Sequence, residues 1–186
     1  MTLTTLPTTD HPPTLAKTPA DAVSFAFGAT SLGQVLVAAT GKGICAILLG
    51  SNQERLIADL HRHFPEAQGS EALGDDIGKV VALIEHPKEP QELALDLQGS
   101  EVEIKVWQAL RTIPPGETLS YSELARRSGV TSGEKGAAKA VADACAGNKI
   151  AVAVPCHRIL RKDGTISGYR WGVHRKRALL EREGRQ

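Results

Sequence analysis

Hydrophobic and polar positions divide the chain into two parts with different patterns. In the first part, apolar runs at residues 23–29, 33–40 and 43–50 are separated by short turns rich in Gly, Thr and Ser, which predicts three strands of an antiparallel meander. Residues 52–64 carry apolar side chains at helical spacing, and Pro65 ends the helix that this spacing predicts.

A second helix over residues 75–85 and a strand over residues 93–97 complete this part, and we expect residues 22–98 to form a small α+β domain. Residues 1–21 are rich in Thr and Pro and lack the charged start and apolar segment of a secretory signal. We expect them to be a disordered leader.

From Gly99 onward the pattern is helical. Ser100–Glu103 and Ser120–Glu123 are capping boxes, each of which predicts the start of a helix, and Thr131–Glu134 is a third candidate before the Ala-rich segment 136–147. Two helices joined by a short turn are the plan of a helix-turn-helix unit. The small side chains of the second helix let its backbone lie close to whatever it docks on, or simply pack two helices tightly, and the two are compatible.

The end of the chain contains a buried segment, a polar loop and a helix. Residues 150–160 have the apolar pattern of a buried strand, interrupted by Pro155. The polar loop covers residues 161–172, and the closing helix covers residues 173–184. Residues 99–186 are therefore expected to form a second domain.

The charges also divide between the two parts. Residues 1–98 contain 6 Lys and Arg against 12 Asp and Glu, whereas residues 99–186 contain 16 against 9, so the net charges are −6 and +7. A basic part beside an acidic part is typical of a nucleic-acid-binding protein with a companion domain. Chance clustering of solvated charges is the alternative.

Composition excludes several classes of protein. The chain of 186 residues is 41% hydrophobic and 23% charged, and its apolar runs are far shorter than the ~20 residues that span a bilayer. Its cysteines, Cys45, Cys145 and Cys156, are odd in number and lack CxxC spacing, which argues against a disulfide framework and a cysteine zinc site. We expect a cytoplasmic protein without a metal, with Cys45 and Cys145 in the core.

Cys156 and His157 are the candidate reactive residues. Thiolate is the reactive form of cysteine, and a neighbouring His or a cation such as Arg158 lowers the pKa of the thiol. Adjacent side chains on extended backbone point to opposite faces, so either the chain turns here or a water carries the proton between the two. A third group should orient the imidazole, and the closing helix supplies Glu181 and Glu183.

These residues belong to a longer pattern that covers nearly the whole chain from Val23 to Glu183. The stretches GICAILLG, VWQALRTIP, GETLSY, ADACAGNK, VPCHR and SGYRWGVHRK resemble the O6-alkylguanine-DNA alkyltransferase family, and within it the alkyltransferase half of the bacterial adaptive-response (Ada) proteins. The resemblance implies a small ribonuclease-H-like N-terminal domain, followed by a helix-turn-helix, winged-helix-like DNA-binding domain.

The resemblance also implies a function, the repair of DNA by irreversible transfer of the alkyl group of O6-alkylguanine, and of O4-methylthymine, to Cys156 after the nucleotide is flipped out. His157 is then the base that acts through water, and Glu183 holds its imidazole. Tyr121 donates a proton to the guanine, and Asn148 is the hinge before the acceptor segment. The implied partner is damaged double-stranded DNA, bound by a monomer through the minor groove, with no cofactor and no membrane.

Further residues are expected around the acceptor. The predicted base pocket is lined by Ile159, Tyr169, Arg170 and Trp171. The predicted DNA-binding residues are Tyr121, Arg126, Lys135, Ala138, Lys139 and Arg158.

Two positions carry hypotheses of their own. Lys139 stands where the family usually has an Arg that fills the gap left by the flipped base, and Lys lacks the planar group that stacks on bases. We expect less efficient extrusion, or assistance from Arg126 or Lys135. Trp171 at the pocket rim would favour methyl over benzyl groups; the alternative is packing against the closing helix.

Three other functions are weighed against alkyl transfer. A damage-sensing protein of the alkyltransferase-like type would lack the acceptor, which Cys156 argues against. A transcriptional regulator of the Ada type would carry a further domain with zinc-binding cysteines. This sequence shows no such cysteines, so we expect at most an indirect role in transcription. A cysteine hydrolase would turn over, whereas an alkyl acceptor stops after one equivalent.

Overall fold

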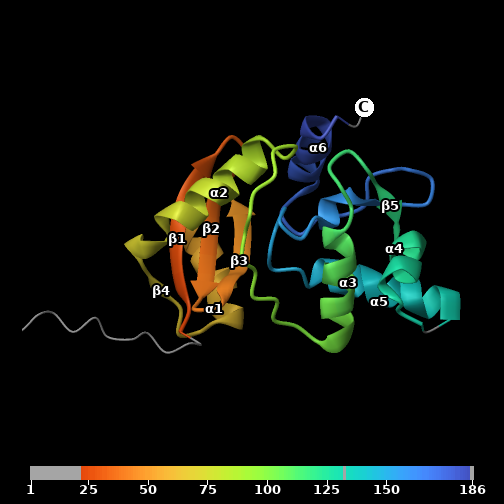
Figure 1. Ribbon diagram of the computed structural model, residues 1–186, viewed down its shortest axis with the longest axis horizontal. Coiled ribbons are helices and arrows are strands. Elements are labelled where there is room, and N and C mark those ends of the chain that lie inside the picture. The colour runs from red at the N-terminus through yellow and green to blue at the C-terminus, as the bar shows by residue number, and fades with distance from the viewer. Residues whose placement is uncertain (1–21, 132, 185–186) are drawn as a thin grey trace, which may run out of the picture.

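The molecule places a sheet and two helices on one side and the remaining helices on the other (Figure 1). This computed structural model describes residues 22–131 and 133–184, without the side chains of residues 133–135. The leader expected at residues 1–21 lies outside the described residues. Within the described residues, no helix is long and apolar enough to cross a membrane.

The three predicted strands form an antiparallel meander, as their apolar runs indicate. Strands β1 (Ser24–Thr30), β2 (Gly33–Thr40) and β3 (Gly43–Gly50) pair in sequence order. A fourth strand, β4 (Gln68–Gly69), pairs with β1 in parallel and gives the order β3-β2-β1-β4. Because β4 has two exposed residues, no apolar alternation marks it in the sequence.

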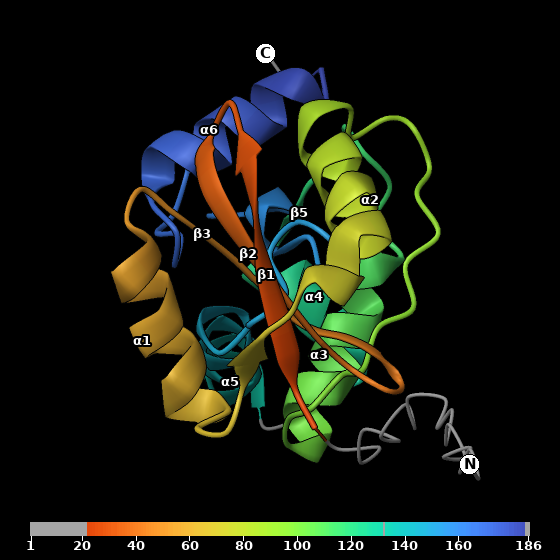
Figure 2. The ribbon, with the colours of Figure 1, turned by 90° about the vertical axis from the view of Figure 1, so that its left-hand side faces the viewer.

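Both predicted helices of this part are present and flank the sheet (Figure 2). Helix α1 (Gln53–His63) begins where the Asn52 side chain accepts a hydrogen bond from the backbone of Arg55 at 2.9 Å. Helix α2 (Gly74–Glu85) follows a short 3-10 turn, Glu71–Leu73, and buries Val80 and Ile84.

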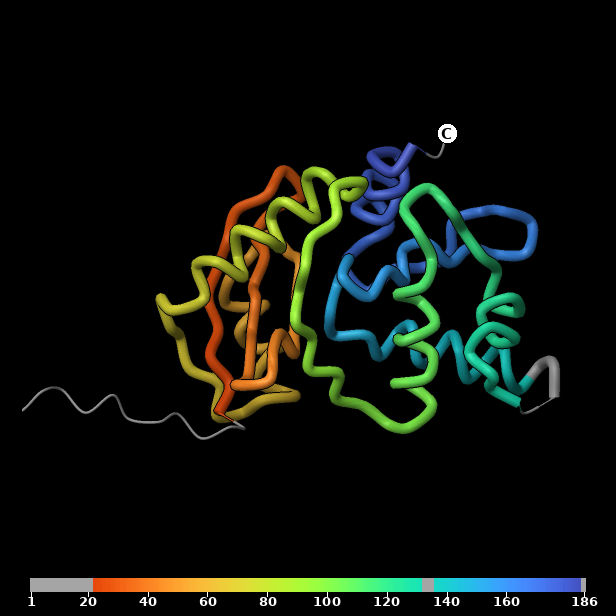
Figure 3. The backbone as a smooth tube through the Cα atoms, viewed as in Figure 1, coloured from red at the N-terminus to blue at the C-terminus, as the bar shows by residue number. Residues whose placement is uncertain are grey.

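The strand expected over residues 93–97 is wrong. The segment makes one isolated parallel bridge, in which Ile44 donates to the carbonyl of Ala94 at 2.8 Å and accepts from Asp96 at 2.8 Å. Residues 86–100 instead run alongside β3 between the two parts of the molecule (Figure 3). At Gly43, a Cβ atom would lie 2.5 Å from the carbonyl oxygen of Ala94, so the close approach requires glycine.

Both complete capping boxes are confirmed in the second part. They begin α3 (Glu101–Arg111) at Ser100 and α4 (Tyr121–Ser128) at Ser120, where each serine and the glutamate three residues later exchange hydrogen bonds. Helix α5 (Gly133–Ala146) is the next helix of the described chain. The side chain of Glu134, needed for the third box, lies outside the described residues.

The strand expected over residues 150–160 is also wrong, although the segment is buried as predicted. Ile150 makes a single parallel bridge to Ile47, and turns follow, with Val152 at a positive φ of 65°. A 3-10 turn covers Cys156–Arg158, and only Ile159–Leu160 (β6) pairs as a strand, in parallel with β5 (Leu119–Ser120). Turns and strands share the same apolar composition when both are fully buried, so the sequence pattern does not separate them.

The two parts share a continuous apolar core. At their junction, the backbone of Ile47 donates to Lys149 at 2.8 Å and accepts from Ala151 at 2.9 Å. The predicted polar loop connects β6 to helix α6 (Val173–Arg182), which closes the described chain. The architecture is thus mixed α+β, with the edge strand β3 supporting the segment that leads to Cys156.

Candidate functional site

Cys156 lies at a cavity of about 390 Å³ between α4, α5 and the loop of residues 161–172. The thiol residue is 6% exposed. The chain turns at Cys156–Arg158, which form a 3-10 turn, but the thiol makes no hydrogen bond to the imidazole among the described residues, so the alternative of proton transfer through a water stays open. The other residues that line the cavity are Tyr121, Ala142, Cys145, Ala146, Gly168, Tyr169 and Arg170.

Asn148 fixes the acceptor segment from within. Its side-chain amide donates to the carbonyl of Val154 at 2.9 Å and to the sulfur of Cys156 at 3.3 Å, and its oxygen accepts from Ile150 at 2.8 Å. Asn148 is fully buried, so these contacts replace those with water. The residue therefore holds both ends of the turn that carries the thiol.

His157 is held by a buried carboxylate. Its Nε2 lies 2.7 Å from Oε1 of Glu183, and the same carboxylate accepts from the guanidinium of Arg158 at 2.8 and 3.0 Å. Because Nε2 donates to Glu183, the lone pair of the neutral imidazole is on Nδ1, which has no hydrogen-bond partner among the described residues. Nδ1 is the nitrogen that can accept a proton. Glu181, the other candidate, is exposed.

Burial shapes the ionisation of this cluster. Burial raises the pKa of the Cys156 thiol, and this effect outweighs the hydrogen bond from Asn148, which lowers the pKa. Burial also lowers the pKa of His157, and this effect outweighs the contact with Glu183, which raises the pKa. Burial alone would raise the pKa of Glu183, but hydrogen bonds from His157 and Arg158 outweigh it and lower the pKa to about 2. The resting site therefore holds a neutral thiol, a neutral imidazole and a carboxylate.

A role of Arg158 in DNA binding would require its side chain to lie on the surface, but the side chain is buried. It is 6% exposed, and its guanidinium bonds Glu183 and the carbonyl of Ile113. This guanidinium is not available to a phosphate, because it compensates the buried carboxylate.

Tyr121 reaches the cavity from the first residue of α4. Its hydroxyl lies 2.8 Å from the hydroxyl of Ser167, which also accepts from the buried ammonium of Lys176 at 3.0 Å. Burial raises the pKa of Tyr121, so its phenol stays protonated. Neither Ser167 nor Lys176 was singled out from the sequence, because only the fold brings them to Tyr121.

The four residues predicted to line a base pocket divide into two pairs. Tyr169 and Arg170 line the cavity, but Ile159 and Trp171 do not. Ile159 is fully buried below it, and Trp171 is 5% exposed with its ring 5.2 Å from that of Tyr169. The indole is thus packed inside rather than at the rim, which removes the basis for selection between alkyl groups by Trp171.

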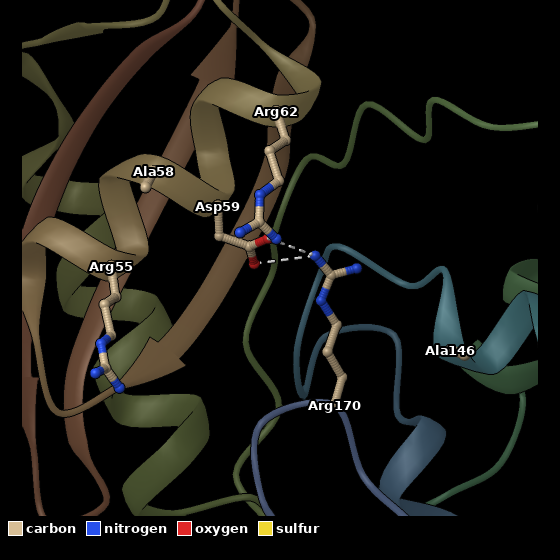
Figure 4. A pocket seen from close by; sticks show the side chains of 6 residues that line it. All are labelled: Arg55, Ala58, Asp59, Arg62, Ala146 and Arg170. Carbon is tan, nitrogen blue, oxygen red and sulfur yellow. Dashed lines mark hydrogen bonds and ion pairs between the residues drawn. The ribbon is translucent and has the colours of Figure 1, made fainter.

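Arg170 joins the loop to the sheet side of the molecule. Its Nη2 donates to both carboxylate oxygens of Asp59 in α1, at 3.1 and 3.0 Å (Figure 4). An open depression of about 610 Å³ surrounds this ion pair, with Arg55 and Arg62 on the α1 side (Figure 4). The ion pair ties one wall of the thiol cavity to the first part of the chain.

The predicted DNA-binding residues of α4 and α5 are mostly accessible. Arg126 and Lys139 are exposed and Ala138 is half-buried, while the side chain of Lys135 lies outside the described residues. Lys139 forms an ion pair of 2.6 Å with Asp143, one helical turn further on. Arg126 lines an open groove of about 780 Å³ between the two helices, to which Lys162 also contributes.

The other cysteines differ from each other. Cys45 is buried in β3, as predicted, and burial raises its pKa to about 12. Cys145 is half-buried and packs against the core while also lining the thiol cavity, so its expected place in the core is confirmed only in part. In the described part of the chain, His, Cys, Asp and Glu side chains do not form groups of three or more that could bind a metal ion.

Comparison with known proteins places this site in a family. Residues 101–185 match the family described as "6-O-methylguanine DNA methyltransferase, DNA binding domain". The chain is 47% identical over 165 residues to the bifunctional transcriptional activator/DNA repair enzyme Ada of Escherichia coli, an alignment that covers 87% of this chain and 46% of Ada. It is 49% identical over 92 residues to a methylated-DNA–protein-cysteine methyltransferase of Mycobacterium tuberculosis, covering 50% of this chain and 53% of that protein.

The chain thus spans about half the length of these curated relatives, but a solved structure matches nearly end to end. The structure of Mycobacterium tuberculosis OGT in complex with DNA superposes with a TM-score of 0.72 at 31% identity, covering 86% of this chain and 92% of that one. A methyltransferase from Pyrococcus kodakaraensis shares the fold, with a TM-score of 0.63. On these matches, which extend over the segment with Cys156, His157 and Glu183, the chain belongs to the O6-methylguanine-DNA methyltransferase family.

Proposed function

We propose that this protein repairs DNA by moving the alkyl group of O6-alkylguanine onto Cys156, each molecule acting once. The observation that carries the proposal is the placement of Cys156 at a cavity, next in sequence to a buried imidazole whose Nε2 is held by Glu183 and whose Nδ1 has no hydrogen-bond partner among the described residues. A cavity of about 390 Å³ accommodates a single base.

In the proposed reaction, His157 accepts the thiol proton through a water, and the sulfur attacks the alkyl carbon. A C–S bond forms and the bond between the carbon and O6 of guanine breaks. The resulting imidazolium lies against the Glu183 carboxylate, which stabilises its charge. The thioether has no chemical return, so transfer is stoichiometric.

The departing guanine carries negative charge, which Tyr121 neutralises by donating a proton. The phenol lines the same cavity as Cys156, and its raised pKa keeps that proton available. Ala142, Ala146 and Gly168 leave the cavity wide enough for a flipped base. Asn148 acts as the hinge that holds the thiol in place.

The DNA surface that we propose consists of α4, α5 and the turn between them, read as a helix-turn-helix unit in a winged-helix-like domain of residues 99–186. Residues 22–98 form the ribonuclease-H-like companion domain. Helix α5 lies in the minor groove of the double-stranded DNA, with Tyr121, Ala138 and Lys139 near the groove. Arg126 and Lys135 face the phosphate backbone of the DNA. The accessible Arg126 and Lys139 support this, as does the net charge of +7 after residue 98. The protein acts as a cytoplasmic monomer.

Intact-protein mass spectrometry tests the proposal directly. The protein is incubated with duplex DNA containing O6-methylguanine, as wild type, Cys156→Ala and the control Cys45→Ala. We expect the mass of one methyl group on the wild type and on the control, and none on Cys156→Ala. Peptide mapping should place the methyl group on Cys156 rather than on its cavity neighbour Cys145.

Two outcomes would contradict the proposal. An unmodified wild type that still binds the damaged duplex tightly would indicate the damage-sensing function. Repeated consumption of substrate without a mass change would indicate hydrolysis.

A further inference from the structure

Ser167 connects a buried cation with the phenol at the cavity. Its Oγ lies 3.0 Å from Nζ of Lys176 in α6 and 2.8 Å from the hydroxyl of Tyr121 in α4. Ser167 is 8% exposed and Lys176 is 1% exposed, so water does not compete for the contact between these two residues, whereas the contact with Tyr121 is half-buried. Three side chains from separate elements therefore form one short chain of hydrogen bonds that ends in the cavity.

The direction of the first bond is fixed by the ammonium group, which can only donate. Lys176 directs its three protons to three acceptors: the carbonyl of Ile159 at 2.6 Å, Oγ of Ser167 at 3.0 Å and the carbonyl of Gly168 at 3.4 Å. Ser167 is thus an acceptor toward Lys176, and its own proton must go elsewhere.

The direction of the second bond follows from the single proton of Ser167. Among the described residues, the hydroxyl of Tyr121 is the other hydrogen-bond partner of this serine. If Tyr121 donated to Ser167, the serine proton would be buried without an acceptor, which proteins avoid. Ser167 therefore donates to Tyr121, and the phenol proton is left to point into the cavity.

We propose that Ser167 is a positioning residue for alkyl transfer, which fixes the rotation of the Tyr121 hydroxyl so that its proton faces the flipped guanine. The inference rests on the proposed function and adds a residue to it. Each donor in the chain polarises the next, so the Lys176 charge strengthens the hydrogen bond that Tyr121 offers to the base. Without Ser167, the phenol proton is free to rotate away from the base, and the polarisation is lost.

Single-turnover rates on duplex DNA containing O6-methylguanine test this role. We expect Ser167→Ala to slow methyl transfer about tenfold, as for loss of one charge-assisted hydrogen bond, without weakening binding of the damaged duplex. The matched control is Ser51→Ala, which removes a serine hydroxyl that also accepts from a cation of α6, Arg175 at 3.1 Å, away from the cavity. We expect wild-type rates from this control.

A double-mutant cycle with Tyr121→Phe separates positioning from general structural damage. In the Tyr121→Phe background, Ser167→Ala should slow transfer less than about twofold, because the hydroxyl that it positions is gone. Ser167→Thr and Ser167→Val differ only in the hydroxyl, so this pair gives the same comparison if the alanine variant loses stability. We expect Thr to retain the rate and Val to lose it.

Three results would overturn the inference. One is a Ser167→Ala rate equal to that of Ser51→Ala, and another is an equal loss from Ser167→Ala with and without the Tyr121→Phe substitution. The third is an unmethylated wild type, which would remove the proposed function itself. A wild type that is methylated together with an unaffected Ser167→Ala would refute only the positioning role.

Discussion

The imidazole of His157 and the carboxylate of Glu183 meet at 2.7 Å, with both side chains fully buried. Arg158 contacts the same carboxylate at 2.8 Å, so one anion compensates a guanidinium and orients a base. The structural and the chemical roles of Glu183 are therefore inseparable. A change at this position should affect both the stability of the fold and the reaction.

Replacement of Glu183 by Gln should destabilise the protein by about 3 kcal/mol at pH 7, because it leaves the Arg158 charge buried without a partner. Urea unfolding measures the loss. The lowered pKa of Glu183, about 2, means that its contribution is present above pH 4.5 and is lost as the pH falls toward 2. The difference between wild type and variant should thus shrink in acid, and a constant difference would contradict this account.

The pH dependence of methyl transfer should report His157. Burial lowers its pKa below the ordinary 6.5, so the imidazole is neutral and able to accept a proton at pH 7. The single-turnover rate should stay level near pH 7 and fall only below pH 6.5. An inflection above 6.5 would contradict the lowered pKa of the imidazole. In Glu183→Gln, which lacks the carboxylate that favours the charged form, the inflection should move further down.

Lys139→Arg should speed transfer on duplex DNA about threefold, because a planar guanidinium stacks on bases and an ammonium does not. Lys139 is exposed and paired with Asp143 on its own helix, which leaves room for the larger group. Rates on a single-stranded substrate should not change, since no base pair is broken there. Lys79→Arg, on the exposed side of α2, is the matched control, and an unchanged duplex rate for Lys139→Arg would refute the hypothesis about extrusion.

The range of alkyl groups should depend on α5 rather than on Trp171. Ala142→Leu narrows the cavity and should slow transfer of a benzyl group at least about tenfold more than transfer of a methyl group, through steric overlap. Trp171→Phe should lower the midpoint of unfolding and leave the ratio of the two rates unchanged. A benzyl-to-methyl ratio that follows Trp171 instead would restore the indole as the selective residue.

Local signals in the sequence predicted the elements that depend on neighbouring residues. Ser100 and Ser120 begin helices because the glutamate that completes each capping box is three residues away. The strand predicted over residues 150–160 does not form, because the turns of this segment, with Val152 at positive φ, are as apolar as a strand. Propensity and periodicity carry no information on which buried shape such a run takes.

The candidate site shows the same limit. Cys156 and His157 are adjacent in sequence. The resemblance to the family predicts roles for Glu183, Asn148 and Tyr121, which lie further away in the sequence. The spacing of residues along the chain does not predict features that arise only on folding. Examples are the hydrogen bond between Ser167 and Lys176, the position of Ala142 in the cavity wall and the burial of Arg158. These are long-range relationships that no local pattern encodes.

The hydrogen bonds between Ile47 and the Lys149–Ala151 backbone make the second part of the chain depend on the first for its shape. Cys156, the proposed acceptor, belongs to the second part, but the segment before it takes its shape against an edge strand of the first. A truncated second part would expose that backbone and its apolar surroundings to solvent. Grafting the second part onto a foreign partner therefore requires a replacement for β3, which supplies these hydrogen bonds.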